Sequence, residues 1–396
     1  MPEHGERVNV LLTAILLMSA PVVALLQLLL WLMLWPLAAV GLLSAERLGW
    51  SSRRLTSAVW LHGASLGEWN ALLPLVSRIG GGRCAGSYMS RNAERARVAR
   101  SCADQAALPL DLWPAYWLRI ARWRPDAIVL AEVDLWPVFL VMAWLHRIPV
   151  IWINARLDRS MGKVLAVLRS FYRCMLGRAV YIHAIDARTA ADLRRWGYRV
   201  DQAELNLKWA RHIVAEHAAK PDTSTLLLAS IHADENDVIA AAAQWWQVDR
   251  DGRRVIVAPR QLSQLPELKA LAQQAGARDW EFVERYGVMD QCYRRAGLVV
   301  VGGTFDDVGG HNPVEAAIYG ATVICGPSVH GQLASVELLR RTGNVAEVRD
   351  ADALRALLLH GDTGLHSTQE LEAVLRRSAE LADTVAAKVH TLCRYN

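Results

Sequence analysis

Residues 8–45 form one uninterrupted stretch without a charged side chain, and no other feature limits the fold of this chain as strongly. A membrane span needs about 20 apolar residues, so at least one membrane-embedded segment is expected here. A single helix over the whole stretch would measure about 57 Å, against a hydrocarbon core of about 30 Å. Because Pro21 and Pro36 would interrupt such a helix, we place the span near residues 22–43, with residues 8–20 interfacial or extending it.

The flanks of this stretch indicate how it is inserted. A cleaved signal peptide begins with a cationic segment and has a shorter apolar region, whereas this chain carries two acidic residues before position 8. After the stretch, Arg47, Arg53 and Arg54 stand against Glu46 alone. The positive-inside bias therefore predicts an uncleaved single anchor in a membrane, with the body of the protein in the cytoplasm beside an anionic lipid surface.

Composition limits what the rest of the chain can be. With 396 residues, 53% of them hydrophobic and 21% charged, it has enough apolar material for two folded domains. A net charge of +5 without dense Lys/Arg runs argues against nucleic acid as a partner and favours an anionic substrate or membrane surface. The six cysteines are far apart and never form a Cys-x-x-Cys pair, so neither a disulfide framework nor a metal site is expected.

Beyond the apolar stretch, short Val- and Ile-rich runs alternate with longer amphipathic segments, which is typical of βαβ units on parallel sheets. The pattern predicts an α/β fold of two doubly wound domains that face a cleft: an anchor at 1–45, a first domain at 46–205 and a second at 206–396. The expected strands are 58–63, 126–132, 149–154, 179–186, 225–230, 254–260, 297–303 and 322–327, with helices at 68–79 and 136–146. In such domains ligands bind at the carboxyl ends of the strands, so the loops there should carry the chemistry.

The first such loop lies within residues 60–76, where a strand leads through small residues into a helix. Ser65 and Gly67 would let a ligand approach the backbone, and the helix start would attract an anion. Glu68 opens the helix. By itself it could be no more than a favourable carboxylate in the first turn.

A second loop, at 131–137, places Glu132 and Asp134 at a strand end. Carboxylates there can orient a hydroxyl group or tune a nearby base. Alternatively, one of them could cap the helix that begins after Trp136, an interpretation that suits Asp134 better than Glu132.

A third loop, at 299–317, joins a strand through a glycine-rich turn to a helix with Pro313 in its first turn. Free backbone N–H groups at such a turn can hold a phosphate. The adjacent Asp306 and Asp307 lack a third ligand and are better explained as a solvated turn than as a metal site. Arg260 and Lys208 supply cations that could neutralise a phosphate leaving group.

Taken together, these loops resemble the 3-deoxy-D-manno-octulosonic acid (Kdo) transferases, which move Kdo from CMP-Kdo to lipid A precursors at the inner membrane of Gram-negative bacteria. The matching segments follow the family's order: HGASLGE at 62–68, LPLD at 108–111, AEVDLWP at 131–137, NARL at 154–157, NLK at 206–208, ASIH at 229–232, APR at 258–260, GGHNPVE at 309–315 and CGP at 325–327. The resemblance implies the two-Rossmann GT-B fold and an inverting, metal-independent transferase without a resident cofactor. It also implies a CMP-activated sugar as donor and a lipid A precursor as acceptor.

The resemblance also implies roles for single residues. Glu68 matches the family's proposed general base, and Glu132 a second functional acid that places the acceptor or supports the base. The remaining positions are expected to contact the donor: Ser65, Gly67, Lys208, Ser230, Arg260, Gly309, Gly310, His311, Asn312 and Glu315, with Glu315 on the ribose hydroxyls.

This chain departs from the family pattern at several positions. Ile231 stands where threonine is common, Gln261 where histidine is common and Asp134 where glutamate is usual, and residues 84–95 replace a threonine-glycine-serine loop. The segment from Leu205 to Ala210 differs as well. The sugar, the acceptor and the number of sugars added therefore stay open, and so do two alternatives: a related CMP-ulosonate transferase with another acceptor, and a non-catalytic nucleotide-sugar-binding membrane protein.

Overall fold

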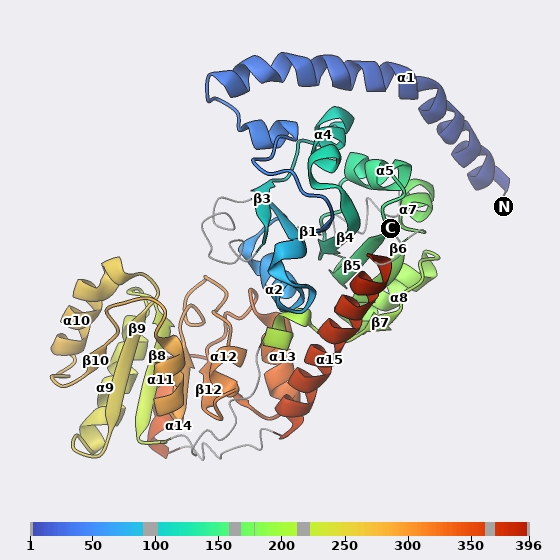
Figure 1. Ribbon diagram of the computed structural model, residues 1–396. Helices are drawn as coiled ribbons and strands as arrows, with labels where there is room; N and C mark the ends of the chain where they lie inside the picture. The colour runs from blue at the N-terminus through green and yellow to red at the C-terminus, as the bar shows by residue number, and fades with distance from the viewer. Residues whose placement is uncertain are drawn as a thin grey trace. The chain divides into compact units, whose positions relative to one another are not determined.

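The computed structural model describes residues 3–89, 102–157, 168–177, 179–211, 222–360 and 369–393, with side chains from residue 21 onward. The chain forms two compact units, which Figure 1 shows with their elements labelled. The first comprises Met1–Arg211 together with Arg377–Asn396, and the second comprises His212–Arg376.

The last residues of the chain, which the sequence analysis placed in the second domain, are therefore part of the first unit. They form most of the helix α15 (Gln369–Leu392). This helix is held to the first unit by polar contacts as well as by its apolar face: Arg78 Nε lies 2.5 Å from Asp383 Oδ1, and the carbonyl of Arg78 lies 3.3 Å from His390 Nε2.

The first unit is built on a parallel sheet whose described strands follow the order β3-β2-β1-β4-β5-β6-β7. Their bounds are β1 (Ala58–His62), β2 (Cys84–Tyr88), β3 (Asp104–Ala107), β4 (Pro125–Ala131), β5 (Val150–Ala155), β6 (Ala179–Ala184) and β7 (Gln202–Ala203). The central strands are buried along their whole length, as expected for a sheet covered by helices on both faces. The order reverses between β1 and β4, which pair in parallel with His62 opposite Leu130.

The second unit repeats this design with the described strand order β10-β9-β8-β11-β12-β13, again all parallel. Its strands are β8 (Thr225–Ile231), β9 (Arg254–Pro259), β10 (Glu281–Phe282), β11 (Leu298–Val301), β12 (Thr322–Cys325) and β13 (Val345–Glu347). Here the order reverses between β8 and β11. The two-domain α/β prediction from the sequence is confirmed.

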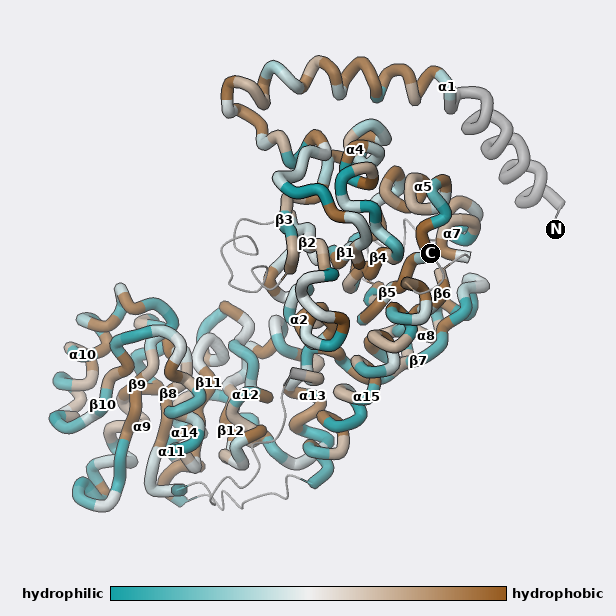
Figure 2. The backbone as a smooth tube through the Cα atoms, viewed as in Figure 1, coloured by the Kyte–Doolittle hydropathy of each residue, from teal (hydrophilic) through white to brown (hydrophobic). Residues whose placement is uncertain are grey.

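Both units contain helices as well as strands, and apolar side chains from several of these helices join the buried cores. Figure 2 shows how hydropathy varies along the backbone. In the first unit the helices are α1 (Glu3–Ala39), α2 (Leu66–Ile79), α4 (Trp113–Trp123), α5 (Pro137–Leu145), α7 (Arg169–Leu176) and α8 (Ala187–Arg195), with short 3₁₀ turns η1 (Ala45–Leu48), η2 (Gly81–Arg83) and η4 (Leu207–Arg211). In the second unit they are α9 (Asn236–Val248), η5 (Leu262–Gln264), α10 (Leu265–Gln274), α11 (Met289–Arg295), α12 (Val314–Ala317), α13 (Leu333–Arg341) and α14 (Ala351–His360).

Two predictions about local structure were wrong. Residues 84–88, assigned to a loop, form β2. Gly86 lies there because a Cβ atom would come within 2.8 Å of the Trp69 ring, so only glycine lets strand and helix pack this closely. Residues 90–95 of the same predicted loop lie outside the described part of the chain.

The second correction concerns the apolar stretch, which forms one helix through both prolines rather than an interrupted one. A proline removes only one N–H donor, and the long apolar segments on either side keep the helix continuous. The helix stops at Ala39 because Gly41 adopts φ 77°, and the N–H of Leu42 donates to the carbonyl of Leu37 at 2.9 Å. This left-handed glycine cap ends the helix before residue 43. Among the described residues, Pro21–Ala39 is the one segment long and apolar enough to cross a membrane.

Arg119 of α4 is fully buried and holds the segment that precedes the first strand of the sheet. Its guanidinium group donates to the backbone carbonyls of Glu46, Gly49, Trp50 and Ala107 at 2.7–3.3 Å. Burial lowers the pKa of Arg119 to about 10, which still leaves it charged at neutral pH. This arginine therefore serves the fold.

We predict that Arg119→Met lowers the free energy of unfolding by about 3–5 kcal/mol, because several buried carbonyls lose their donors together. Urea unfolding of the full chain in detergent, followed by tryptophan fluorescence, measures the loss. Arg195→Met is the control: Arg195 is an exposed arginine whose pair with Asp192 should contribute less than about 1 kcal/mol. Equal effects of the two substitutions would contradict a structural role for Arg119.

Candidate active site

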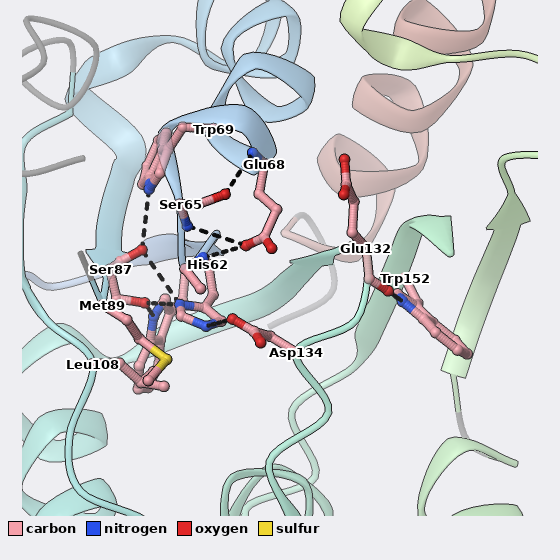
Figure 3. A network of polar contacts seen from close by, with 12 residues as sticks. His62, Ser65, Glu68, Trp69, Ser87, Met89, Leu108, Glu132, Asp134 and Trp152 are labelled. Carbon is pink, nitrogen blue, oxygen red and sulfur yellow. Dashed lines mark hydrogen bonds and ion pairs between the residues drawn. The ribbon is translucent and has the colours of Figure 1, made fainter. Parts of the chain in front are cut away.

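The loops after β1 and β4 lie side by side because these two strands pair at the point where the strand order reverses. In doubly wound sheets, a crevice that can hold a ligand forms between the two loops at the point where the strand order reverses. Figure 3 shows the side chains gathered here, which include Glu68, Glu132 and Asp134 from the predicted site. The fold therefore brings together two of the loops that the sequence predicts to carry the chemistry.

Glu68 is held at the start of α2 by a capping box. The backbone N–H of Glu68 donates to Ser65 Oγ at 3.3 Å, while Glu68 Oε2 accepts the N–H groups of Ala64 and Ser65. Glu68 is therefore a first-turn carboxylate of α2, the role that the sequence left open, and this capping box fixes where its carboxyl group lies. Gly67 is exposed beside it.

The environment of Glu68 makes it a stronger base than an ordinary carboxylate. Burial raises the pKa of Glu68 to about 7, and the negative charges of Asp134 and Glu132 add to the rise, although the hydrogen bonds from Ala64 and Ser65 act against it. A carboxyl group with a pKa near neutrality can exchange a proton with a substrate at physiological pH.

Asp134 is positioned by a buried network that the sequence analysis did not identify. Its Oδ2 lies 3.2 Å from His62 Nε2, and His62 Nδ1 lies 2.8 Å from Ser87 Oγ, which also accepts the indole N–H of Trp60 (Figure 3). The signal available in the sequence was a histidine at the end of a Val- and Leu-rich strand, where a fully buried polar side chain needs partners.

The capping role considered for Asp134 is wrong. The first residues of α5 are capped by Asp111, whose carboxylate accepts the N–H groups of Val138 and Phe139, each at 3.2 Å. Asp111 belongs to the LPLD segment that carries part of the family resemblance. Asp134 is thereby left to face His62.

Glu132 occupies a left-handed backbone position, with φ 58°, directly after β4. Its carbonyl accepts the indole N–H of Trp152 at 2.7 Å, which fixes the turn. The carboxylate forms an ion pair with Lys208. Among the described residues, Glu132 thus has a cationic partner, whereas the partners of the Glu68 carboxylate are backbone N–H groups.

Lys208 itself is placed by two interlocked asparagines. Asn154 Nδ2 donates to Asn206 Oδ1 at 2.7 Å, and the same Asn206 oxygen accepts the N–H of Lys208 at 3.0 Å. Asn154 Oδ1 accepts the N–H of Leu207 at 3.1 Å. The NARL and NLK segments therefore act together to hold one lysine in the first unit, a connection that their separation in the sequence hides.

The second unit has a comparable polar cluster after β8 and β11. Glu235, which the sequence analysis missed, is buried and accepts the N–H groups of His232 at 2.9 Å, Gly303 at 2.9 Å and Phe305 at 3.2 Å. Burial raises the pKa of Glu235, and these hydrogen bonds oppose the rise. One carboxylate thus ties the two predicted donor-binding loops together.

The glycine-rich loop needs its glycines. Gly309 and Gly310 have φ values of 91° and 82°, and Cβ atoms there would lie 2.5 Å from His330 and 2.9 Å from Thr304. Farther along, Asn312 Nδ2 donates to Glu315 Oε1 at 3.3 Å, and Asn312 Oδ1 accepts the N–H of Val314. The helix α12 that follows has only four residues, so its dipole is weaker than the sequence suggested.

A pair of histidines lies beside this loop. The Nε2 atoms of His232 and His311 are 3.1 Å apart, and the two rings stack at 14°. Burial lowers the pKa of His311 to about 4, assisted by the positive charge of Arg260. His311 is therefore neutral at pH 7, and Arg260 is close enough to act on it electrostatically. Ser230, which precedes this cluster at the end of β8, adopts φ 56°.

The predicted residues therefore fall into two sets. Ser65, Gly67, Glu68, Glu132 and Lys208 belong to the first unit, and Ser230, Arg260, Gly309, Gly310, His311, Asn312 and Glu315 belong to the second. In the described part of the chain no three His, Cys, Asp or Glu side chains are arranged to hold a metal ion.

Comparison with solved structures identifies the fold. The chain is similar to the crystal structure of MurG from Acinetobacter baumannii, with a TM-score of 0.52 and 14% identity, over 85% of this chain and 99% of that one. At this identity the likeness shows the fold alone. The chain has the GT-B fold, built from two Rossmann-like units, as the sequence predicted.

The sequence comparisons indicate the family. The family model described as 3-deoxy-D-manno-octulosonic-acid transferase (kdotransferase) matches residues 44–211. A relative from Chlamydophila psittaci named 3-deoxy-D-manno-octulosonic acid transferase is 27% identical over 72% of this chain and 72% of its own length. A relative of the same name from Aquifex aeolicus is 24% identical over 87% and 96%. These matches show that the chain is similar to the Kdo transferases, and they support a divergent relationship to that family of glycosyltransferases.

The electrostatics of Glu68 predict a pH dependence. Because its pKa is raised to about 7, the carboxyl group is protonated below that pH and cannot accept a proton, so turnover should fall on the acid side with a midpoint of about 7. Asp134→Asn removes a negative charge that raises this pKa, so the acid limb should move to lower pH. Rate measurements from pH 5 to 9 test both statements.

Asp126→Asn provides the control for this shift, since Asp126 lies at the opposite end of β4 from the cluster. An acid limb that stays in place in Asp134→Asn, or moves equally in both variants, would show that Asp134 does not act on the group that titrates.

Proposed function

We propose that this protein is an inverting transferase that moves Kdo from CMP-Kdo to a lipid A precursor (lipid IVA), a step of lipopolysaccharide core biosynthesis. Similarity to the Kdo transferases supports the sugar and its activation. The observation that carries the mechanism is Glu68, a buried carboxyl group with a pKa near 7 at the reversal point of the first sheet.

In the proposed step, a hydroxyl oxygen of the acceptor attacks the anomeric carbon of the donor. Glu68 accepts the hydroxyl proton as the new C–O bond forms, and the bond between the anomeric carbon and the CMP phosphate oxygen breaks. CMP leaves with the bonding electrons. A single displacement inverts the anomeric centre. General-base assistance of this kind contributes about 10²–10⁴-fold to a rate.

Glu132 and Lys208 have a supporting role in this proposal. Their ion pair places a fixed cation and anion close to Glu68, and the pair could orient the acceptor hydroxyl or the sugar carboxylate. Ser65 fixes the helix start at which Glu68 lies, and Gly67 leaves the neighbouring backbone open to a ligand.

The second unit would bind the donor. Arg260 neutralises the charge that develops on the CMP phosphate, and the neutral His311 can donate a hydrogen bond to it. Ser230, Gly309, Gly310 and Asn312 line this part, and Glu315 would hold the ribose hydroxyls. With these groups the reaction needs neither a divalent metal nor a cofactor.

The proposed site of action is the cytoplasmic face of the bacterial inner membrane, where the apolar helix α1 attaches the enzyme. The acceptor is a lipid, so attachment keeps enzyme and acceptor on the same surface. An alternative within the same chemistry is a related CMP-ulosonate transferase with a glycolipid or capsule acceptor. This alternative is supported by Asp134 and Gln261, which stand where the family commonly has other residues.

The direct test is mass analysis of products after incubation of the full-length enzyme with CMP-Kdo and a tetra-acylated lipid A precursor. We expect one or more Kdo additions, with equal yield in EDTA because no step uses a metal ion. No addition to this acceptor would contradict the proposed acceptor, and activity lost in EDTA and restored by magnesium would contradict metal independence.

The role of Glu68 is tested by Glu68→Gln, which keeps size and polarity but cannot accept the proton. Turnover should fall by at least about 10², while donor binding stays within about threefold. Glu284→Gln, a change to an exposed carboxylate that pairs with Lys269, controls for the loss of a charge. Near-normal turnover in Glu68→Gln would point to another base, with Glu132 next, and loss of donor binding would make Glu68 a ligand contact or a structural cap.

A further inference from the structure

Between Ala24 and Ala38, the helix α1 lies along the body of the first unit. Within Pro21–Ala39, where the side chains are described, seven are half-buried and recur every three or four residues, which places them on one face of the helix. They are Ala24, Gln27, Leu28, Trp31, Leu34, Trp35 and Ala38. At 1.5 Å per residue this stripe is about 21 Å long.

Three hydrogen bonds fix this arrangement. Gln27 Oε1 accepts the backbone N–H of Trp113 at 3.0 Å, and the indole N–H of Trp113 donates to the carbonyl of Ala24 at 2.9 Å. The indole N–H of Trp31 donates to the carbonyl of Leu48 at 2.9 Å. Two of these hydrogen bonds join α1 to α4, and the third joins it to η1.

Gln27 also completes α4. The residue before that helix is Leu112, whose side chain cannot cap it, so the free N–H at Trp113 finds its acceptor in α1. Gln27 is the only side-chain amide within Pro21–Ala39. A polar amide in the middle of an apolar helix is expensive in hydrocarbon unless it has a partner, and here the body of the enzyme supplies one.

These contacts are incompatible with a helix that crosses the bilayer. If Pro21–Ala39 spanned the hydrocarbon core of about 30 Å, the body packed along about 21 Å of it would be immersed as well. That body includes Glu46 and Arg47 of η1, and each charged side chain at the centre of a bilayer costs about 2.5–3.5 kcal/mol or more. The helix also measures about 55 Å over its 37 residues, which is too long for an upright span.

The face of α1 turned away from the body is apolar and exposed. It carries Val22, Val23, Leu25, Leu26, Leu29, Leu30, Leu32, Met33 and Leu37, with Met33 73% exposed. Trp117 lies one turn after Trp113 on α4 and is 53% exposed. Trp50, which follows η1, is also exposed and stacks with Arg122 at 4.0 Å. Tryptophan is the residue typical of the headgroup level.

We infer that α1 lies in the plane of the membrane, with its docked stripe on α4 and η1 and its exposed apolar face in the acyl region of a phospholipid bilayer. The exposed Arg53 and Arg54 then lie near anionic headgroups. This replaces the membrane span expected from the sequence by a helix that never crosses, and it rests on the membrane attachment proposed above. It also places both ends of the chain on the same side of the membrane.

Topology is tested on the full-length chain with one epitope tag at each end, expressed in a bacterial host. Spheroplasts are treated with protease, and membranes are extracted with carbonate. The in-plane arrangement predicts that both tags survive in intact spheroplasts, that both are lost after lysis, and that the protein sediments with the membranes. Digestion of the N-terminal tag in intact spheroplasts, with the C-terminal tag protected, would show a spanning helix and overturn the inference.

Cross-linking in native membranes tests the docking separately. The pair Gln27→Cys/Trp113→Cys should be joined by a short bis-maleimide, identified by mass spectrometry, whereas Leu29→Cys/Trp113→Cys, with its cysteine on the opposite side of α1, should not. Both tags protected without a Gln27–Trp113 cross-link would contradict the docked arrangement. Recovery of the protein only in the soluble fraction would contradict membrane attachment, and product formation measured on the same preparations reports on the transferase proposal independently.

Discussion

The reversal of strand order beside the first strand of each sheet is the constraint on which both polar clusters depend. Because β1 pairs with β4, the loop that carries Glu68 and the loop that carries Glu132 and Asp134 leave the same edge of the sheet next to each other. The pairing of β8 with β11 does the same for the loops around His232 and the glycine-rich segment. Residues that are distant in the sequence become neighbours through backbone pairing alone, and side-chain contacts such as those of Glu235 then fix the loops.

The first cluster holds three carboxyl groups close together, those of Glu68, Glu132 and Asp134, and their mutual repulsion would destabilise the fold if all three were charged and without partners. Lys208 neutralises Glu132, and His62 faces Asp134, so two of the three have a partner that can carry or share positive charge. Among the described residues, the donors to Glu68 are backbone N–H groups. Because the carboxyl group is also buried, its pKa is raised. The capping residue and the proposed base are thus the same side chain, and the start of α2 keeps it in place.

The sequence allowed the α/β class, the main strands and the loops of the site to be predicted, because apolar runs of strand length and polar residues directly after them are local patterns. Short edge strands such as β7 and β10 escaped, since two residues carry no periodicity. The role of Asp111 as the cap of α5 could not be read locally either, because the helix it caps begins 26 residues later. The roles of His62 and Glu235 could not be predicted either, because their buried partners include residues that are distant in the sequence.

Composition is least informative where it is most one-sided. An uncharged stretch predicts a membrane segment, but it does not reveal that Gln27 and Trp31 on one stripe of the helix make hydrogen bonds to the first unit. Arginines interleaved with tryptophans on α4 would equally suit a lipid surface, yet Arg119 is buried and holds backbone carbonyls. In both cases tertiary contacts decide what the pattern means.

The central claim is that Glu68 is a carboxyl group with a pKa near neutrality. Its titration can be followed directly by infrared difference spectroscopy of the carboxyl C=O band, with the Glu68→Gln variant identifying the band that belongs to this residue. We expect a band that Glu68→Gln removes and that titrates with a pKa of about 7 in the enzyme without substrate. A band that titrates near the ordinary value of 4.5 would contradict it.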